Sequence, residues 1–303
     1  DIRIVFLGPS DCGKSTLWRQ LESSYSSGHH NDDKHEYVDL IKSNLVKGIK
    51  TLIDTAMSKG KNFSNDMMAT IDHINQLSLN PKILSPQSAE KIIRVWNHPN
   101  IEEIYKQIQY TDMTDNFEYL INNINRITQP NYSPTDEDII NCFTPTKKIS
   151  SMKFCLNNTI TAELFDVSGS KLLRNQWENL MGADFFVFVA SLSDFGIFLS
   201  EDKNVQRTAD SFELFEKVAN SEKPIFLVLN KTDVFETKLN NLPEKFRETY
   251  KSFNGDTNNV NECIEHVKQC YLSRVDPGRD FQKAWIEPIE SCAIDKKSVT
   301  QLF

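Results

Sequence analysis

The spacing of hydrophobic residues divides this chain into a first strand, a long helical region, and a region of alternating strands and helices. Residues 2–7 are apolar except for Arg3, a pattern typical of a buried strand. From Glu36 to Met57 apolar residues recur every three or four positions, which predicts a long amphipathic helix. No convincing alternating pattern appears between Asp33 and Thr128. Further helices are predicted at 65–77, 88–97, 101–109 and 115–127.

Beyond residue 150 short strand-like runs return. Met152–Leu156 and Thr159–Val167 are separated by Asn157-Asn158, a pair typical of a hairpin turn. Buried strands are predicted at 185–190, 225–229 and 285–292, with helices at 206–219 and 260–271. Apolar strands that alternate with helices indicate a mostly parallel sheet covered on both faces, and the hairpin adds one antiparallel edge. We therefore predict an α/β fold interrupted by an all-helical insert.

Composition excludes some classes of protein. The 303 residues are 25% charged and 39% hydrophobic, with a formal net charge of -8. No block of Lys and Arg is long enough to indicate nucleic-acid binding. No apolar run is long enough to span a membrane, and no signal peptide is visible. The six cysteines form no C-x-x-C pair, which favours a reducing, intracellular compartment.

A complete phosphate-binding motif follows the first strand. Residues 8–16 read Gly-Pro-Ser-Asp-Cys-Gly-Lys-Ser-Thr, the G-x-x-x-x-G-K-S pattern, and a helix is predicted from Lys14 to about Ser23. The loop amides and the helix N-terminus make a positive cradle for phosphate. The Lys14 ammonium is suited to the outer phosphates, and the Ser15 hydroxyl to Mg²⁺. The sequence therefore predicts a nucleoside-phosphate site.

Three further motifs point to guanine as the base. Asn230–Asp233 reads N-K-T-D after a predicted strand, and the Asp233 carboxylate is suited to accept hydrogen bonds from two guanine N–H groups. Asp166–Gly169 matches D-x-x-G, which supplies a carboxylate near Mg²⁺ and a glycine amide near the γ-phosphate. Ser291-Cys292-Ala293 follows a late strand, where a backbone amide is placed to meet the guanine oxygen. Four elements in this order predict a GTP-binding site.

The order of these motifs, with a helical insert after the first helix, resembles the α-subunit of heterotrimeric G proteins. The resemblance covers nearly the whole chain and implies a Ras-like P-loop GTPase domain with a mostly parallel six-stranded sheet and an inserted all-helical domain. The implied boundaries are 1–25 and 143–303 for the GTPase domain and 26–142 for the insert, with the nucleotide held between them. The segments that carry the resemblance are Gly8–Gln20, Arg126–Thr135, Leu164–Val167, Leu192–Phe195, Glu201-Asp202 and Phe226–Asp233.

The resemblance also implies roles for individual residues. Ser15 and Thr146 are expected to ligate Mg²⁺ directly, and Asp166 through a water. Asp11 matches an acidic residue that pairs with the family's switch I arginine, and Trp177 matches a tryptophan that reports activation. The residues expected at GTP or GDP are Asp11, Cys12, Gly13, Lys14, Ser15, Thr16, Asp115, Thr146, Gly169, Asn230, Lys231, Asp233, Cys292 and Ala293.

Three positions depart from the family pattern. Phe143 stands where the family has its catalytic arginine, and Ser170 where it has the glutamine that orients the attacking water. In phosphoryl-transfer enzymes, this family included, such an arginine is worth about 10³–10⁵ in rate. Ser168 replaces a glycine, and its added Cβ is expected to restrict the switch II hinge. We therefore expect GTP binding with very slow hydrolysis. The nearby lysines 147, 148 and 171 lack the guanidinium fork and are expected to be solvated switch residues.

The resemblance leaves two functions open: a signalling switch and a non-switching nucleotide-binding scaffold. A small-substrate kinase or ATPase is disfavoured by Asn230–Asp233 and by the helical insert. The implied partners are βγ subunits, a seven-helix receptor or other exchange factor, effectors and GTPase-activating regulators, with no nucleic acid. The implied location is the cytoplasm or the cytoplasmic face of the plasma membrane, with peripheral association through a terminus that this chain does not include. Leu172 and Leu173 either form an altered partner surface or pack inward.

Overall fold

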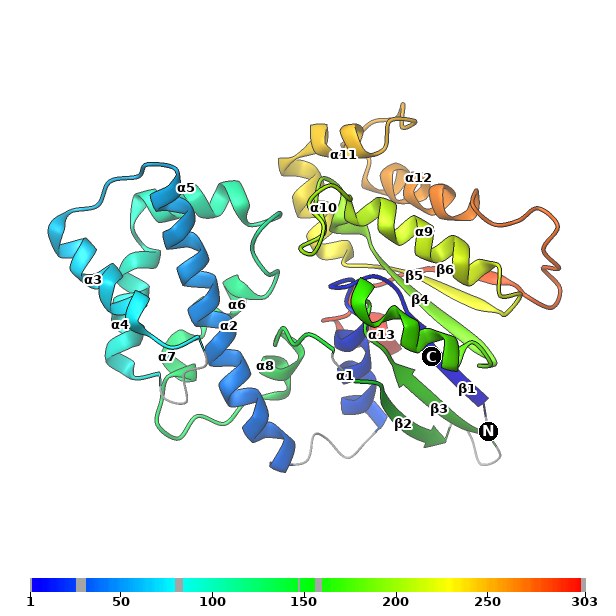
Figure 1. Cartoon of the computed structure of the whole chain (residues 1–303), viewed down its shortest axis with the longest axis horizontal. Helices are drawn as coiled ribbons and strands as arrows, with labels where there is room; N and C mark the ends of the chain where they lie inside the picture. Colours follow the sequence, from blue (N-terminus) through cyan, green and yellow to red (C-terminus); the bar gives the residue numbers. More distant parts are fainter. Residues whose placement is uncertain (1, 26–30, 80–83, 147, 156–159, 301–303) are drawn as a thin grey trace. The chain divides into compact units, whose positions relative to one another are not determined.

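The computed structural model describes residues 2–25, 31–79, 84–146, 148–155 and 160–300, and the chain divides into two compact units (Figure 1). One unit comprises residues 1–25 and 145–303, and the other residues 26–144. The chain passes from the first unit to the second after residue 25 and returns after residue 144. The Asn157-Asn158 turn lies outside the described residues.

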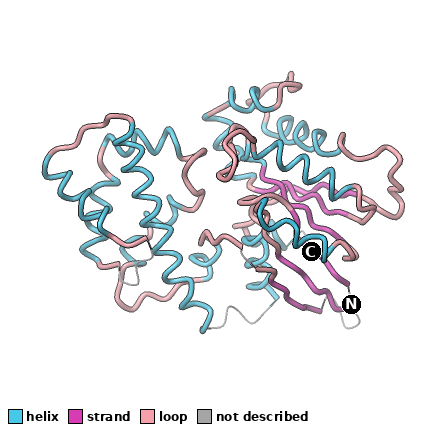
Figure 2. The backbone as a smooth tube through the Cα atoms, viewed as in Figure 1, coloured by secondary structure: helices cyan, strands magenta, loops and turns pink. Residues whose placement is uncertain are grey.

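The first unit is built on a six-stranded sheet with the order β2-β3-β1-β4-β5-β6. All neighbouring strands are parallel except β2 and β3, which are antiparallel, so the predicted mostly parallel sheet is confirmed. Figure 2 shows the strands running side by side. The strands are β1 (Ile2–Leu7), β2 (Ser150–Cys155), β3 (Thr161–Asp166), β4 (Phe185–Ser191), β5 (Ile225–Asn230) and β6 (Ile286–Glu290).

The central strands are apolar on both faces because helices cover both. On one face, Val5 of β1 and Phe188 of β4 belong to a core that includes Phe215 of helix α9 and Tyr271 of helix α12. On the other face, Phe6 joins a second core with side chains of helices α1 and α13. The helices of this unit are α1 (Lys14–Tyr25), α9 (Arg207–Ala219), α10 (Thr232–Asn241), α11 (Pro243–Thr249), α12 (Val260–Leu272) and α13 (Lys296–Thr300), with the 3-10 helices η1 (Lys171–Leu180) and η2 (Leu192–Asp194).

The second unit is helical in all its described elements and is organised around one long helix. That helix, α2, places Leu45, Ile49 and Ile53 in a core of its own. Two of its helices begin at N-capping serines. The Ser64 and Ser85 side chains accept hydrogen bonds from backbone amides in the first turns of α3 and α4. The helices are α2 (Asn31–Ser58), α3 (Asn65–Gln76), α4 (Pro86–Trp96), α5 (Pro99–Ile108), α6 (Phe117–Asn122), α7 (Ile124–Ile127) and α8 (Asp136–Ile140).

The structure corrects one predicted helix and adds several short ones. The helix expected at 115–127 is broken at Asn123, whose φ of -100° and ψ of 7° depart from helical values between α6 and α7. The elements that periodicity did not predict are η1, η2, α8, α10, α11 and α13. Most are shorter than three turns, so they hold too few apolar positions to show a helical period.

Candidate functional site

The phosphate loop connects β1 to α1, as the sequence predicts. Gly13 has a φ of 99°, and a Cβ added there would lie 2.1 Å from the Asn230 amide nitrogen, so only glycine fits this turn. Lys14 is buried, and its ammonium donates to the carbonyls of Gly8 at 3.0 Å and Pro9 at 2.6 Å. The lysine is thus folded back over the loop that it follows.

Three oxygen-bearing side chains meet beside the start of α1. The Ser15 and Thr146 hydroxyl oxygens are 2.7 Å apart, and Ser15 donates to Asp166 Oδ2 at 2.8 Å. Asp166 Oδ1 is buried without a hydrogen-bond partner in the structure. Burial raises the pKa of the Asp166 carboxyl, although the charge of Lys14 acts in the opposite direction. Hydroxyl and carboxylate oxygens with one open position are a donor set that suits a hard divalent cation such as Mg²⁺.

The segment after β5 is tied directly to the phosphate loop. Asn230 is fully buried; its side chain donates to Cys12 O at 2.9 Å and accepts from Ala293 N at 3.0 Å. Lys231 adopts a left-handed conformation, with a φ of 65°, before α10 begins. The Cys292 thiol lies against the Asp233 carboxylate, and burial with that charge raises the thiol pKa to about 11. The predicted base-recognition segments therefore converge.

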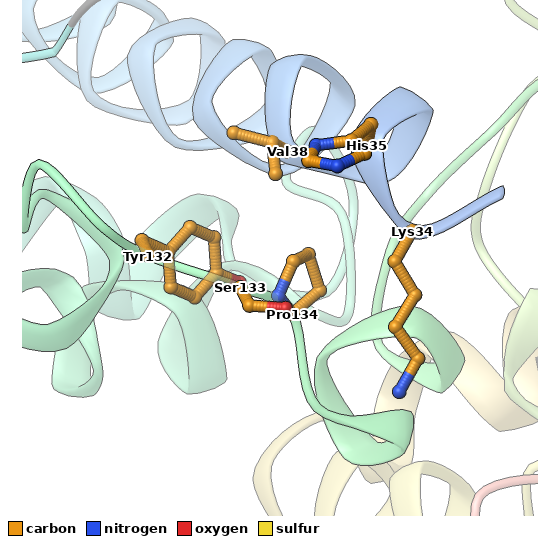
Figure 3. Close-up of a pocket in the computed structure, with 6 residues that line it drawn as sticks. All are labelled: Lys34, His35, Val38, Tyr132, Ser133 and Pro134. Atoms are coloured by element: carbon orange, nitrogen blue, oxygen red, sulfur yellow. The ribbon is translucent and has the colours of Figure 1, made fainter. Parts of the chain in front are cut away.

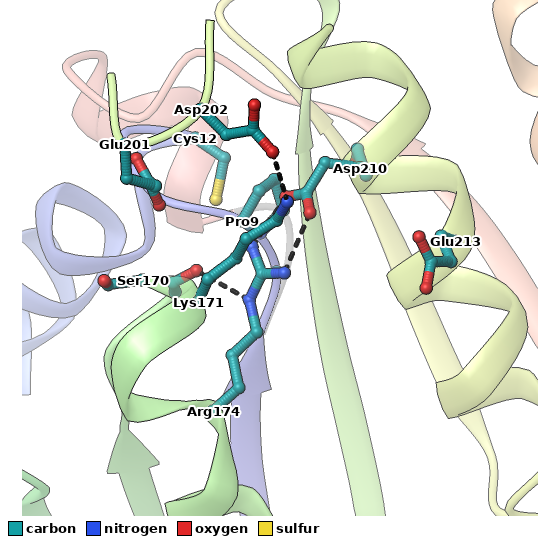
Figure 4. A network of polar contacts seen from close by, with 12 residues as sticks. Pro9, Cys12, Ser170, Lys171, Arg174, Glu201, Asp202, Asp210 and Glu213 are labelled. Atoms are coloured by element: carbon teal, nitrogen blue, oxygen red, sulfur yellow. Dashed lines mark hydrogen bonds and ion pairs between the residues drawn. The ribbon is translucent and has the colours of Figure 1, made fainter. Parts of the chain in front are cut away.

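A polar network holds the segment that follows β3 (Figure 4). Arg174 Nε donates to Gly169 O at 2.9 Å, and its two Nη atoms reach the Asp210 carboxylate at 2.8 and 2.6 Å. Trp177 Nε1 donates to Ser168 O at 2.9 Å. Sequence reasoning missed Arg174 and Asp210, because 36 residues separate them and no motif joins them.

The substituted positions are also placed. The Ser168 hydroxyl accepts from the Ser170 amide at 3.3 Å, which makes a bond that glycine cannot make. The Phe143 backbone is held by Asn44, which accepts from Phe143 N at 2.9 Å and donates to Phe143 O at 3.1 Å. Lys171 lies 3.6 Å from Asp202.

Other candidates end in different positions. Lys148 is exposed, and Lys147 lies outside the described residues. Leu172 is 82% exposed and can contribute to a partner surface, whereas Leu173 is half-buried.

Asp11 has a partner that the sequence did not predict. The family resemblance implied that Asp11 pairs with an arginine at the position of residue 143, but residue 143 is phenylalanine. The carboxylate instead accepts from Arg207 Nη2 at 2.6 Å. Asp115 belongs to the helical unit, where it is exposed, and its expected role at the nucleotide stays a prediction.

The helical unit contains a separate cavity of about 220 Å³ (Figure 3). None of its lining residues is among those predicted for nucleotide or metal. They are Lys34, His35, Val38, Tyr132, Ser133 and Pro134. Among the described residues, no group of three or more His, Cys, Asp or Glu side chains is placed to hold a metal, and no helix is long and apolar enough to cross a membrane.

Comparison with known proteins gives a consistent family. The family model for the G-protein alpha subunit matches residues 1–303. The chain is 28% identical to the guanine nucleotide-binding protein alpha-2 subunit of Caenorhabditis briggsae, over 99% of this chain and 85% of that protein. It is 27% identical to the alpha-15 subunit of the same species, over 98% and 84%. It is also 27% identical to the alpha-1 subunit of Trichomonas vaginalis, over 90% and 69%.

The match to the family model extends over the whole chain, and the structure has the corresponding mostly parallel sheet and many helices. The chain therefore belongs to the G-protein alpha subunit family, and it is a guanine nucleotide-binding signalling subunit.

Proposed function

We propose that this chain is a GDP/GTP-binding switch that hydrolyses GTP very slowly by itself. The observation that carries nucleotide binding is the convergence of the phosphate loop, the oxygen cluster and the base-recognition segments within one unit. The prediction of slow hydrolysis rests on two residues: position 143 is phenylalanine rather than arginine, and position 170 is serine rather than glutamine.

Separate groups would hold the two ends of the nucleotide. The loop amides and Lys14 would bind the phosphates, since Lys14 already donates to two loop carbonyls and can exchange them for phosphate oxygens. Asp233 would accept from guanine N–H groups, and its place beside Cys292 brings the two base-recognition segments together. None of these contacts requires Phe143 or Ser170, so nucleotide affinity is expected to survive their substitution.

Ser15, Thr146 and Asp166 fit a magnesium ion. The Ser15 hydroxyl lies 2.7 Å from the Thr146 hydroxyl and 2.8 Å from Asp166 Oδ2, and Asp166 Oδ1 has no protein partner in the structure. A bound Mg²⁺ would neutralise charge on the phosphate oxygens. The chain's own contribution is to hold the three oxygens beside the start of α1, with Asp166 at the end of β3 and Ser15 in the first turn of the helix.

Slow hydrolysis follows from the side chains at two positions. The Phe143 ring carries no charge to stabilise the transition state, and Ser170 is too short and has no amide to orient a water as glutamine does. The nearby Lys171 faces Asp202, and a lysine cannot reproduce the bidentate fork. Turn-off would then depend on nucleotide exchange or on a regulator that supplies the missing groups.

The second candidate is a scaffold that binds nucleotide without switching. One observation favours it: the Ser168 hydroxyl bonds the Ser170 amide, which restrains a hinge that glycine would leave free. The two candidates differ in whether η1 responds to the γ-phosphate.

The family implies βγ subunits, receptors and effectors as partners in general. We propose that the exposed Leu172 alters the partner surface on η1, since an apolar side chain stands there in a segment where the family carries charged residues. The cytoplasmic face of the plasma membrane is the proposed location, because the implied receptor spans that membrane.

Substitution of Asp233 tests the assignment of the base. Asp233→Asn removes the acceptor for two guanine N–H groups, so GTP and GDP affinity should fall about 10- to 100-fold. Affinity for xanthosine nucleotides should rise, because xanthine offers an acceptor where guanine has its amino group. Equilibrium titration with fluorescent nucleotides measures both. Glu236→Gln, an exposed carboxylate on the same helix, is the matched control. Unchanged GTP affinity in Asp233→Asn would refute the assignment.

A further inference from the structure

Arg207 connects the first turn of α9 to the phosphate loop. Its Nη2 donates to Asp11 Oδ2 at 2.6 Å, and its Nη1 lies 3.7 Å from Asp194 Oδ1. The Arg207 and Asp11 side chains are 17% and 30% exposed, so solvent screens their attraction only in part. The Arg207 amide also donates to Ile197 O at 2.9 Å, which fixes where the helix begins. The guanidinium is therefore presented to Asp11 from a fixed backbone.

The phosphate loop needs such a restraint at Asp11. This residue has a φ of 60°, in the left-handed region, which aspartate adopts more readily than most non-glycine residues but still at a cost in free energy. A conformation of this kind persists where surrounding contacts over-determine it. The charge-assisted bond from Arg207 is one of these contacts, and its loss would leave the loop freer to leave its present form.

A second set of hydrogen bonds connects α9 to the phosphate loop by way of the segment that follows β3. Asp210, one turn after Arg207 on α9, holds Arg174, and Arg174 holds the Gly169 carbonyl. Gly169 packs directly on the phosphate loop, because a Cβ added there would lie 2.3 Å from Pro9 C. The first turn of α9 is thus hydrogen-bonded to the phosphate loop through Arg207, and through Asp210 and Arg174 to the Gly169 segment that packs against that loop.

We infer that Arg207 is a positioning residue that retains bound guanine nucleotide, by tying Asp11 of the phosphate loop to α9 within the GTPase unit. The inference rests on the proposed nucleotide-binding function and goes beyond it. Phenylalanine at position 143 carries no cation, and Arg207 supplies one to the Asp11 carboxylate. The Arg207–Asp11 contribution to retention lies within this unit.

The Arg207–Asp11 pair holds the phosphate loop in its present form, so breaking the pair should lower the barrier to nucleotide release. We expect Arg207→Ala to speed GDP dissociation about tenfold, as loss of one charge-assisted bond implies. Association with Arg207→Ala should change little, because Arg207 is not among the residues expected to contact the nucleotide. Arg207→Lys keeps the charge without the fork and should fall between wild type and Arg207→Ala.

The experiment measures dissociation of a fluorescent GDP analogue, chased with excess unlabelled GDP, from wild type, Arg207→Ala, Asp11→Asn and the double variant. If the pair acts as a unit, the double variant releases GDP no faster than the faster single variant. Lys217→Ala is the matched control, because Lys217 lies on α9 in an ion pair with Glu213 whose two side chains are 67% exposed. Its release rate should stay within about twofold of wild type.

Salt provides a readout that a purely structural role would not give. Raising ionic strength should speed release from wild type and leave the double variant nearly unaffected. If Arg207→Ala does not fold, Asp11→Asn and Arg207→Lys still report on the pair. Wild-type release rates in Arg207→Ala and Asp11→Asn, or additive effects in the double variant, would overturn the inference alone. A wild-type chain that fails to bind the GDP analogue would overturn the proposed function, and the inference with it.

Discussion

Asp138 shows how a single buried carboxylate is kept ionised in the helical unit. Its side chain is fully buried, and Arg126 donates to both of its oxygens at 2.6 and 2.7 Å. Tyr119 donates at 2.8 Å, and the Thr135 amide donates to complete a capping box. Burial alone would raise the pKa of Asp138, but these hydrogen bonds hold it well below its usual range.

Asp138→Asn should therefore destabilise the helical unit by about 2 kcal/mol near pH 7, because it removes charge-assisted bonds from a buried site. Since the folded-state pKa is lowered, the stabilisation is fully present above the unfolded pKa of about 4 and is lost progressively as the pH falls from there through the folded value. Urea unfolding of wild type and Asp138→Asn from about pH 3 to about pH 7 measures the difference in the free energy of unfolding. This range brackets the unfolded-state pKa of about 4.

The neighbouring Glu137 is exposed, so Glu137→Gln is the control and should change stability little. A gap between wild type and Asp138→Asn that stays constant down to the lowest pH would show that the carboxylate charge is not the stabilising feature.

Residue chemistry was predictable where it resides in contiguous motifs. Lys14, Ser15, Asp166 and Asn230 were assigned from short segments, and the structure places each beside the partners described above. The partner of Asp11 was not predictable, because 196 residues separate it from Arg207 and a lone arginine at the start of a helix has no distinctive pattern.

At the scale of elements, continuous apolar strands were predicted well and short polar helices were not. Strands β4 and β5 are buried along most of their length, so their apolar runs are unambiguous. The 3-10 helix η1 buries only Trp177 among its residues, and so it leaves no periodic signal. Its position depends on contacts with distant segments, such as that between Arg174 and Asp210.

Trp177 makes η1 the element whose movement can be measured. The Trp177 indole is 7% exposed and donates a hydrogen bond to Ser168 O, so a shift of η1 would change the environment of the indole. The switch function predicts a rise in tryptophan fluorescence when a non-hydrolysable GTP analogue replaces GDP. The same exchange in Trp177→Phe supplies the signal of the remaining tryptophans. Equal Trp177 signals with both nucleotides would favour the scaffold instead.

At the scale of the whole molecule, binding and hydrolysis rest on different residues. The phosphate loop, the oxygen cluster and the base-recognition segments all lie in the unit built on the sheet, whereas Phe143 belongs to the helical unit. The substitutions at positions 143 and 170 therefore leave the binding groups in place. The family match over residues 1–303 is consistent with retained nucleotide binding.

Single-turnover hydrolysis of bound GTP tests the central claim most directly. The comparison is γ-phosphate release from wild type, Phe143→Arg, Ser170→Gln and the double variant. Asn44 holds the backbone at position 143 through main-chain atoms, so an arginine would be presented by an unchanged backbone. We predict that the double variant releases phosphate at least about 10³-fold faster than wild type. Wild-type hydrolysis as fast as that of the double variant would contradict the account.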